Sequence, residues 1–97
     1  MKLDYDINPS KNVIKYLKKI KDRKLKEKFV SIIYDEISND PFTGEQKTGD
    51  LKGFWTMGFT HNKTTYRVAY MIIEDAVIPI LLVGTHENFY EELKRKW

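Results

Sequence analysis

Hydrophobic positions change their spacing along this chain, and each spacing predicts a different kind of element. Near the start, apolar residues alternate with polar ones at Leu3, Tyr5 and Ile7, which predicts a short half-buried strand. Residues 8–10, Asn-Pro-Ser, end that alternation. From there to about residue 39 the apolar residues recur every three or four positions, and after Gly53 they alternate again. The pattern therefore predicts a strand, then a helical stretch, then further strands.

The helical stretch should form a hairpin of two amphipathic helices over roughly residues 10–39. In the first helix either Asn8 or Ser10 can serve as N-cap, and the apolar positions are Val13, Ile14, Leu17 and Ile20. Asp22 can cap the second helix, whose apolar stripe, broken by Glu36, consists of Leu25, Phe29, Ile32, Ile33 and Ile37. A proline disfavours helical backbone in the preceding residue, so residues 39–41, Asn-Asp-Pro, should end the hairpin.

Three strands are predicted after a polar loop over residues 42–50. The first, Phe54–Thr60, presents Trp55, Met57 and Phe59 on one face, and a tight connection at residues 61–64 follows. In the second strand, Thr65–Ile73, one face carries Tyr66, Val68, Tyr70 and Ile72, and the other carries Arg67, Ala69 and Met71. Glu74 and Asp75 then turn the chain.

The third strand, Val77–Val83, is apolar on both faces, as a covered strand should be. Pro79 has no N–H to donate to a neighbouring strand, so we expect an irregularity there. Residues 87–96 have the composition of a short helix. Strands with segregated helices indicate an α+β domain: an N-terminal strand and helical hairpin packed on a twisted antiparallel sheet, with a short C-terminal helix. With 97 residues the chain can build one modest core, so we expect a single domain over residues 1–97.

Composition excludes several classes of protein. The chain has no cysteine and two histidines, so a disulfide framework and a thiolate zinc site are excluded, and we expect no metal. The first residues lack the apolar run of a secretory signal, and no apolar stretch approaches the roughly 20 residues that span a bilayer. We therefore expect a cytoplasmic protein.

Positive charge is concentrated in the helical hairpin. Residues 11–28 contain nine of the 17 basic residues and two of the 14 acidic ones, which gives this stretch a formal charge of +7 within a net charge of +3. A lysine-rich helix face can be an ordinary solubilising surface. It can also dock on ribosomal RNA or on an acidic protein, and for that role the candidates are Lys15, Lys18 and Lys19.

Three residues with chemical potential fall on the predicted strands or at their ends. Arg67 lies mid-strand and can pair with a carboxylate or present its planar guanidinium to a phosphate. His86 follows the third strand and can be a surface residue or a general acid or base. Tyr90, four residues later, can pack in the core or stack on a base. Together they form a plausible site for phosphodiester chemistry.

Other catalytic signatures are absent. The sequence has no G-x-G-x-x-G, no phosphate-binding loop, no G-x-S-x-G and no His-Glu-x-x-His. The segment from Lys52 to Phe59 is similar to the aromatic strand of an RNA-recognition motif, but it departs at Trp55 and Thr56 and lacks that fold's order of elements. Nucleotide hydrolysis, serine esterase and zinc protease activities therefore have no support.

The order of these features resembles the RelE/ParE superfamily of toxins from bacterial toxin–antitoxin systems. The resemblance rests on the helical hairpin, Leu51-Lys52-Gly53, Tyr66-Arg67-Val68-Ala69-Tyr70 and the ending Gly84-Thr85-His86. The segment Gly84–Tyr90 looks closest to the YafQ-like branch, in which Gly-Thr-His is followed four residues later by an aromatic residue. The resemblance covers most of the chain.

The resemblance implies a ribosome-dependent endoribonuclease that cuts mRNA without a metal or other cofactor and is held by a cognate antitoxin. It implies charge stabilisation by Arg67, proton transfer by His86 and positioning of the nucleotide by Tyr90. RelE, however, has lysines in the strand after its Leu-x-Gly lead-in, where this chain has Thr56, Gly58 and Thr60. Lys52, His61 or Lys63 can substitute, and the general base stays unassigned.

Two alternatives share the fold. One is a ParE-like toxin that inhibits DNA gyrase without nuclease activity, although His86 at the strand end argues against it. The other is an interaction module without toxicity.

Overall fold

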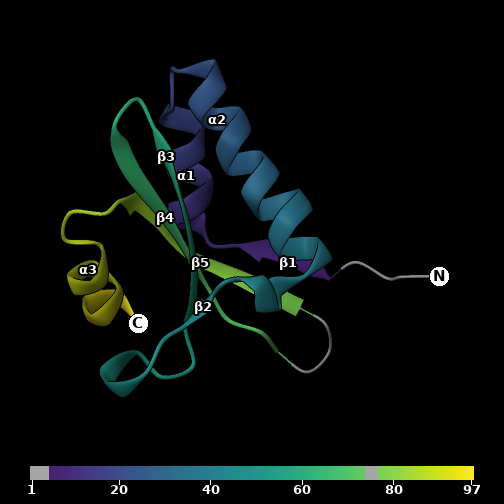
Figure 1. The fold of residues 1–97 in the computed structure, drawn as a ribbon, viewed down its shortest axis with the longest axis vertical. Helices are drawn as coiled ribbons and strands as arrows, with labels where there is room; N and C mark the ends of the chain where they lie inside the picture. The colour runs from purple at the N-terminus through teal and green to yellow at the C-terminus, as the bar shows by residue number, and fades with distance from the viewer. Residues whose placement is uncertain (1–4, 74–76) are drawn as a thin grey trace.

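A five-stranded mixed sheet forms the centre of the computed structural model, which describes residues 5–73 and 77–97 (Figure 1). The strands are β1 (Asp6–Pro9), β2 (Glu45–Gln46), β3 (Trp55–His61), β4 (Thr64–Tyr70) and β5 (Val77–Thr85). Their order across the sheet is β1-β5-β4-β3-β2. The helices are α1 (Lys11–Lys19), α2 (Arg23–Val30) and α3 (Phe89–Lys96). This is the predicted α+β architecture.

The helical hairpin is confirmed over its predicted length. Ser10, rather than Asn8, caps α1, because its side-chain oxygen accepts from the Val13 N–H over 3.3 Å. The Asp22 carboxylate caps α2 by accepting from the N–H groups of Lys24 and Leu25. After α2 the helix continues through a π-helical segment, Ser31–Ile37, and ends before Asp40.

The sheet is mixed because β1 runs parallel to β5, while every other pairing is antiparallel. Pro9 was expected to stop the first strand, yet β1 continues through it. β1 is an edge strand, so the missing N–H of Pro9 leaves no partner unsatisfied. Leu3, which the predicted strand included, lies outside the described residues.

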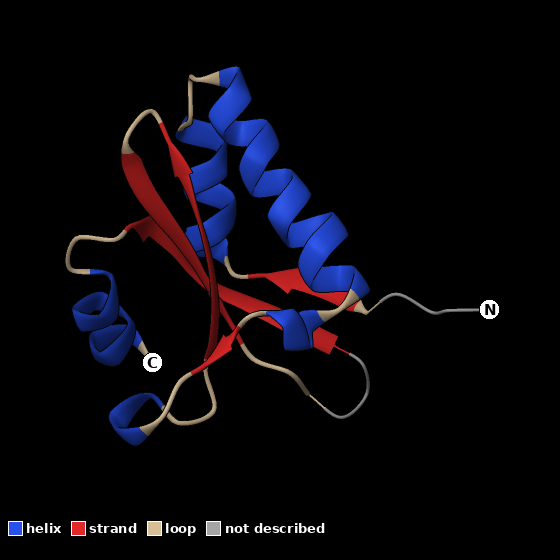
Figure 2. Ribbon diagram, in the orientation of Figure 1, coloured by secondary structure: helices blue, strands red, loops and turns tan. Residues whose placement is uncertain are grey.

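The helical hairpin and α3 lie on different sides of the sheet (Figure 2), and each face of the sheet has its own core. The hairpin covers one face, where buried Phe29, Ile33 and Ile37 pack with Val68 and Tyr70. On the opposite face α3 packs its buried Phe89 and Leu93 against a second cluster, whose members from the strands and loop are Leu51, Ala69 and Leu82. The alternation predicted for β3 and β4 is therefore confirmed, and it places Arg67 on the α3 side.

β5 is irregular, as expected, but at Leu81 rather than at Pro79. Ala69 pairs with Leu82 but Tyr70 pairs with Ile80, so β5 carries one extra residue between them. β4 ends at Tyr70, earlier than predicted, and beyond it Ile73 forms only an isolated bridge with Val77. The turn predicted at Glu74 and Asp75 lies outside the described residues.

The segment predicted as a polar loop contains regular structure. Short 3₁₀ turns at Pro41–Thr43 and Gly49–Leu51 flank β2, in which Glu45 pairs with Thr56 and Gln46 with Trp55. Residues 45–46 lack an apolar alternation, because β2 binds by its backbone and exposes both side chains. Among the described residues, no helix is both long and apolar enough to cross a membrane.

Candidate active site

Arg67, His86 and Tyr90 lie together on the α3 side of the sheet. The Nε of Arg67 donates a hydrogen bond to Nδ1 of His86 over 2.9 Å. The guanidinium carbon of Arg67 is 5.8 Å from the centroid of the Tyr90 ring. The His86 ring stands edge-on to Tyr90, with ring centroids 6.5 Å apart. The structure therefore brings together the three residues singled out in the sequence, and their chemical roles stay a prediction.

Glycines on both neighbouring strands leave space around Arg67. In the sheet Arg67 pairs with Gly58 of β3 on one side and Gly84 of β5 on the other. A Cβ at Gly84 would meet nothing within 4 Å. A Cβ at Gly58 would lie 3.0 Å from the Tyr66 carbonyl oxygen and 3.4 Å from Nη1 of Arg67. The guanidinium thus lies against the bare backbone of Gly58 and reaches the end of β5.

His86 is fixed in both backbone and tautomer. Its N–H donates to the Thr65 carbonyl oxygen over 2.8 Å, which extends the β4–β5 pairing one residue past Thr85. A guanidinium has only hydrogen-bond donors, so Nδ1 of His86 must accept from Arg67 through its lone pair. The neutral imidazole therefore carries its proton on Nε2. This nitrogen is on the other side of an exposed ring and is free to donate.

The start of α3 sets the position of Tyr90. Asn88 has a left-handed backbone with φ of 59°, and this conformation turns the chain from β5 into the helix. The Phe89 N–H donates to the His86 carbonyl oxygen over 3.2 Å. Because Phe89 and Leu93 anchor the helix in the second core, the half-buried Tyr90 is held beside His86.

Lys47, which sequence reasoning missed, completes the group. It follows β2, and its N–H donates to the Phe54 carbonyl oxygen over 2.9 Å. Its ammonium lies 4.6 Å from the centroid of the Tyr90 ring and 2.8 Å from Oε1 of Glu45. The hydrogen bond between Lys47 and Glu45 raises the pKa of Lys47 and lowers the pKa of Glu45, so both side chains are charged near neutral pH. Only the pairing of β2 with β3 reveals this lysine.

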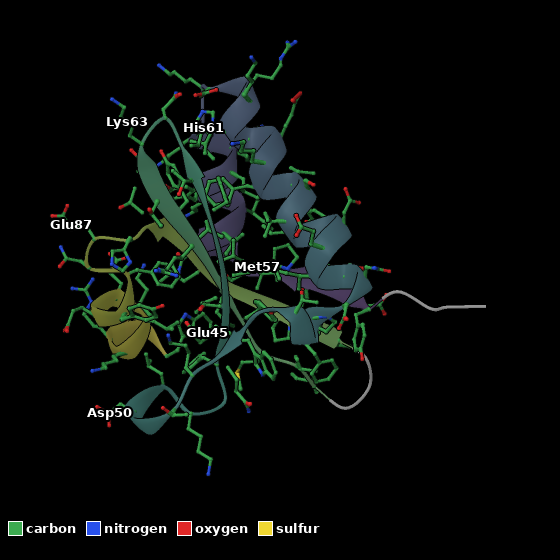
Figure 3. The ribbon with its side chains drawn as sticks, in the orientation of Figure 1. Glu45, Asp50, Met57, His61, Lys63 and Glu87 are labelled. Carbon is green, nitrogen blue, oxygen red and sulfur yellow. The ribbon has the colours of Figure 1, made fainter. Side chains whose placement is uncertain are left out.

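The residues predicted to bind RNA or the ribosome lie outside this group. His61 and Lys63 lie at the tip of the β3–β4 hairpin, far along the sheet from Glu45 (Figure 3). His61 is engaged there, because its Nε2 is 2.8 Å from a carboxylate oxygen of Asp22. Lys52 is exposed after the 3₁₀ turn at Gly49–Leu51.

On α1 the three candidate lysines are exposed, as a docking surface requires. Lys15 and Lys19 also line a hollow of about 520 Å³ between α1 and α3, which Gly84 and Glu87 share. Within residues 5–73 and 77–97, no three potential ligands gather into a metal site. The arrangement at the α3 side instead offers two cations, an aromatic ring and an oriented imidazole around an open patch of backbone, which suits an anionic ligand with an aromatic base.

The sequence model of ParE-like toxins of type II bacterial toxin–antitoxin systems matches residues 7–94 of the chain. The chain belongs to this family. The comparison with curated proteins gives no match. The ParE-like toxin fold, however, is found in solved structures of RelE toxins and of their complexes.

The similar structures cover nearly all of the chain. The toxin–antitoxin complex RelBE2 from Mycobacterium tuberculosis has a TM-score of 0.70 at 19% identity, over 89% of this chain and 95% of that one. A mutant of the Escherichia coli toxin RelE in the free state has a TM-score of 0.59 at 20% identity, over 98% and 100%. The intact E. coli RelBE toxin–antitoxin complex has a TM-score of 0.55 at 18% identity, over 86% and 98%. At these identities the likeness establishes a shared RelE-like fold.

Proposed function

We propose that this ParE-like toxin is a metal-independent endoribonuclease that cleaves mRNA on the ribosome and so inhibits translation. One observation carries the proposal: the 2.9 Å hydrogen bond from Arg67 to His86 beside the Tyr90 ring. A guanidinium binds a phosphodiester, an imidazole moves a proton near neutral pH, and a phenol ring stacks on a base. Phosphate binding, proton transfer and positioning of the base together support RNA cleavage in which the 2′-hydroxyl attacks the adjacent phosphate.

In the proposed reaction the 2′-oxygen forms a bond to the adjacent phosphorus and the bond from phosphorus to the 5′-oxygen breaks. His86 takes the proton from the 2′-hydroxyl, and the departing 5′-oxygen takes a proton from water. The products are a 2′,3′-cyclic phosphate and a 5′-hydroxyl end. Arg67 stabilises the negative charge that develops on the phosphate oxygens.

The free enzyme keeps the His86 base masked. Its basic lone pair is on Nδ1, and the Arg67 N–H occupies it. When a phosphodiester binds the guanidinium, Arg67 turns toward the phosphate and releases Nδ1 to accept the 2′-hydroxyl proton. Substrate binding to Arg67 thus activates His86 as the general base. A positioned acid or base contributes about 10²–10⁴-fold to a rate, and His86 is assigned that share.

We infer a cognate antitoxin as the partner of this toxin. The two similar complexes named above each contain an antitoxin, from M. tuberculosis and from E. coli. An acidic or amphipathic segment that covers the α3 side of the sheet or the basic hairpin would block access to Arg67 and His86. The exposed Lys15, Lys18 and Lys19 would then serve either docking on ribosomal RNA or binding of that segment.

The test is to map the ends of mRNA fragments in a translating extract supplied with the purified toxin. We expect fragments that end in a 2′,3′-cyclic phosphate. We also expect their loss in His86→Ala and Arg67→Ala variants that fold normally. Cleavage unchanged in both variants would overturn the assignment of the site.

The second candidate is a ParE-like toxin that acts on DNA gyrase, which the family match favours. It requires no chemistry from His86. Growth arrest with DNA damage, intact mRNA and full toxicity of His86→Ala would select it over the nuclease.

A further inference from the structure

Lys47 reaches the group formed by Arg67, His86 and Tyr90. The substitutes that the sequence offered, Lys52, His61 and Lys63, lie outside that group. On the α3 side of β3 the alternating positions are Thr56, Gly58 and Thr60, so β3 presents no cation beside Arg67. Lys47 comes instead from the edge of the sheet, immediately after β2. Its side chain is 20% exposed, so the chain of methylenes is packed while the ammonium reaches the Tyr90 ring.

The pair of Lys47 with Glu45 differs from an incidental surface ion pair. Residues two apart on an extended segment point to the same side, which lets Glu45 hold the ammonium at 2.8 Å. The same ammonium lies over the Tyr90 ring, 4.6 Å from its centroid, and the Arg67 guanidinium carbon lies 5.8 Å from that centroid. A cation over a phenol ring is attracted by the ring's negative face. Two independent contacts therefore hold Lys47 at the same ring that borders His86.

We propose that Lys47 is a second phosphate-binding residue of the active site and that Glu45 is the positioning residue that holds it ready. This inference rests on the proposed nuclease function. The phosphodiester accepts from Arg67 and from Lys47, while the base stacks at Tyr90. Glu45 is the counter-ion that the substrate phosphate replaces. A lysine immediately after β2 thus supplies the second cation of the site, which β3 does not supply because it has two threonines and a glycine on this face.

The experiment compares Lys47→Met, Lys47→Arg and Glu45→Gln with Lys96→Met, which removes the same charge from an exposed position on α3. One measurement is the cleavage of mRNA in the translating extract, separated into kcat and KM. The other is binding to a short RNA whose 2′-hydroxyls are replaced by hydrogen, followed by fluorescence anisotropy at several salt concentrations. That probe has no nucleophile, so it reports binding without cleavage, and the salt dependence of its affinity reports the phosphate contacts.

Lys47→Met should lower kcat/KM by about 10²-fold, as removal of one electrostatic contact to a transition state does. It should also reduce the slope of log affinity against log salt by about 0.7, the value for one phosphate contact on a single strand. Lys47→Arg should restore most of both. Glu45→Gln should lower KM, because the phosphate no longer competes with a carboxylate, and should lower kcat, because Lys47 is less well placed. A merely structural role would not separate the two constants in this way.

Lys47→Met indistinguishable from Lys96→Met, in a toxin that His86→Ala inactivates, would overturn the role of Lys47 and leave the proposed function standing. Lys47→Arg as impaired as Lys47→Met would likewise overturn it, since the charge would not be what matters. A parent toxin that neither cleaves nor binds RNA would overturn the proposed function itself.

Discussion

The two glycines that flank Arg67 allow a matched test of how closely the guanidinium must be placed. Gly58→Ala introduces a methyl group 3.0 Å from the Tyr66 carbonyl oxygen and 3.4 Å from Nη1 of Arg67. Gly84→Ala introduces the same group on the other side of Arg67, where nothing lies within 4 Å. Both glycines lie in strands and both changes remove the same backbone freedom. The two variants therefore differ mainly in how closely the new methyl group approaches the Tyr66 carbonyl oxygen and Nη1 of Arg67.

The size of the effect follows from those distances. Ordinary contacts to a Cβ begin near 3.4 Å, so with alanine at position 58 the Tyr66 carbonyl oxygen must retreat by a few tenths of an ångström. That carbonyl belongs to the peptide bond leading into Arg67, so its retreat also moves Arg67. A misplacement of about 1 Å in an active site costs about 10²-fold in rate, so a third of that displacement should cost about fivefold. Gly84→Ala should stay within about twofold of the parent, because no neighbour has to move.

The rate is measured as single-turnover cleavage of mRNA in a translating extract, with thermal melts to show that both variants fold. A second readout is the ¹⁵N chemical shift of His86, which reports whether Nδ1 still accepts a hydrogen bond. We expect Gly58→Ala to slow cleavage and shift the Nδ1 signal while Gly84→Ala does neither. Equal rates for the two variants would refute the reasoning that the close packing of Gly58 against β4 sets the position from which Arg67 acts.

Three further predictions concern stability. The buried Thr56 hydroxyl has no hydrogen-bond partner among the described residues, so Thr56→Val should stabilise the fold by about 1 kcal/mol in urea denaturation, and a loss of stability would contradict this. The Tyr70 hydroxyl donates to the Pro41 carbonyl oxygen over 2.6 Å, and burial raises the pKa of Tyr70 to about 12. The neutral phenol is therefore favoured in the fold, and its contribution is complete below about pH 10 and lost as the pH rises toward 12. Tyr70→Phe should be less stable than the parent by about 1–2 kcal/mol at pH 8, and the difference should narrow above pH 10; a constant difference would argue against the linkage. The contacts of Asp22, chiefly with His61, lower the pKa of its carboxyl, so the stability it provides is present above about pH 4 and lost as the pH falls below that value. Asp22→Asn keeps a side-chain oxygen that can cap α2, so the variant should lose less stability than the parent as the pH falls below about 4. Thermal melts over a series of pH values would show this.

The sequence was sufficient to predict the elements whose apolar residues recur at helical or strand spacing. The spacing of Val13 and Leu17, and of Phe29 and Ile33, predicted the hairpin because a helix must bury one stripe. The alternation around Arg67 predicted its side of the sheet for the same kind of reason. Which of the two faces the hairpin covers was not predicted.

Elements defined by backbone pairing could not be predicted in this way. β2 has neither apolar alternation nor buried side chains, so only its hydrogen bonds with β3 reveal it, and Lys47 with it. The direction of β1 was equally hidden, because parallel and antiparallel partners present the same alternation. His61 was a plausible RNA-binding residue in sequence, yet its contact with Asp22 depends on how the β3–β4 hairpin meets the α1–α2 turn.

The parallel pairing of β1 with β5 determines when, during synthesis, the protein can complete its fold. The Ser10 hydroxyl donates to the carbonyl oxygen of Leu81, 71 residues later. The first strand therefore cannot pair until the last strand has been synthesised. Arg67 likewise meets His86 and Tyr90 only after both have been synthesised. At about 5–20 residues per second, the stretch from Arg67 to Tyr90 takes roughly one to five seconds. During synthesis the growing chain therefore carries the arginine without its histidine, and the proposed nuclease is inert until Tyr90 has been made.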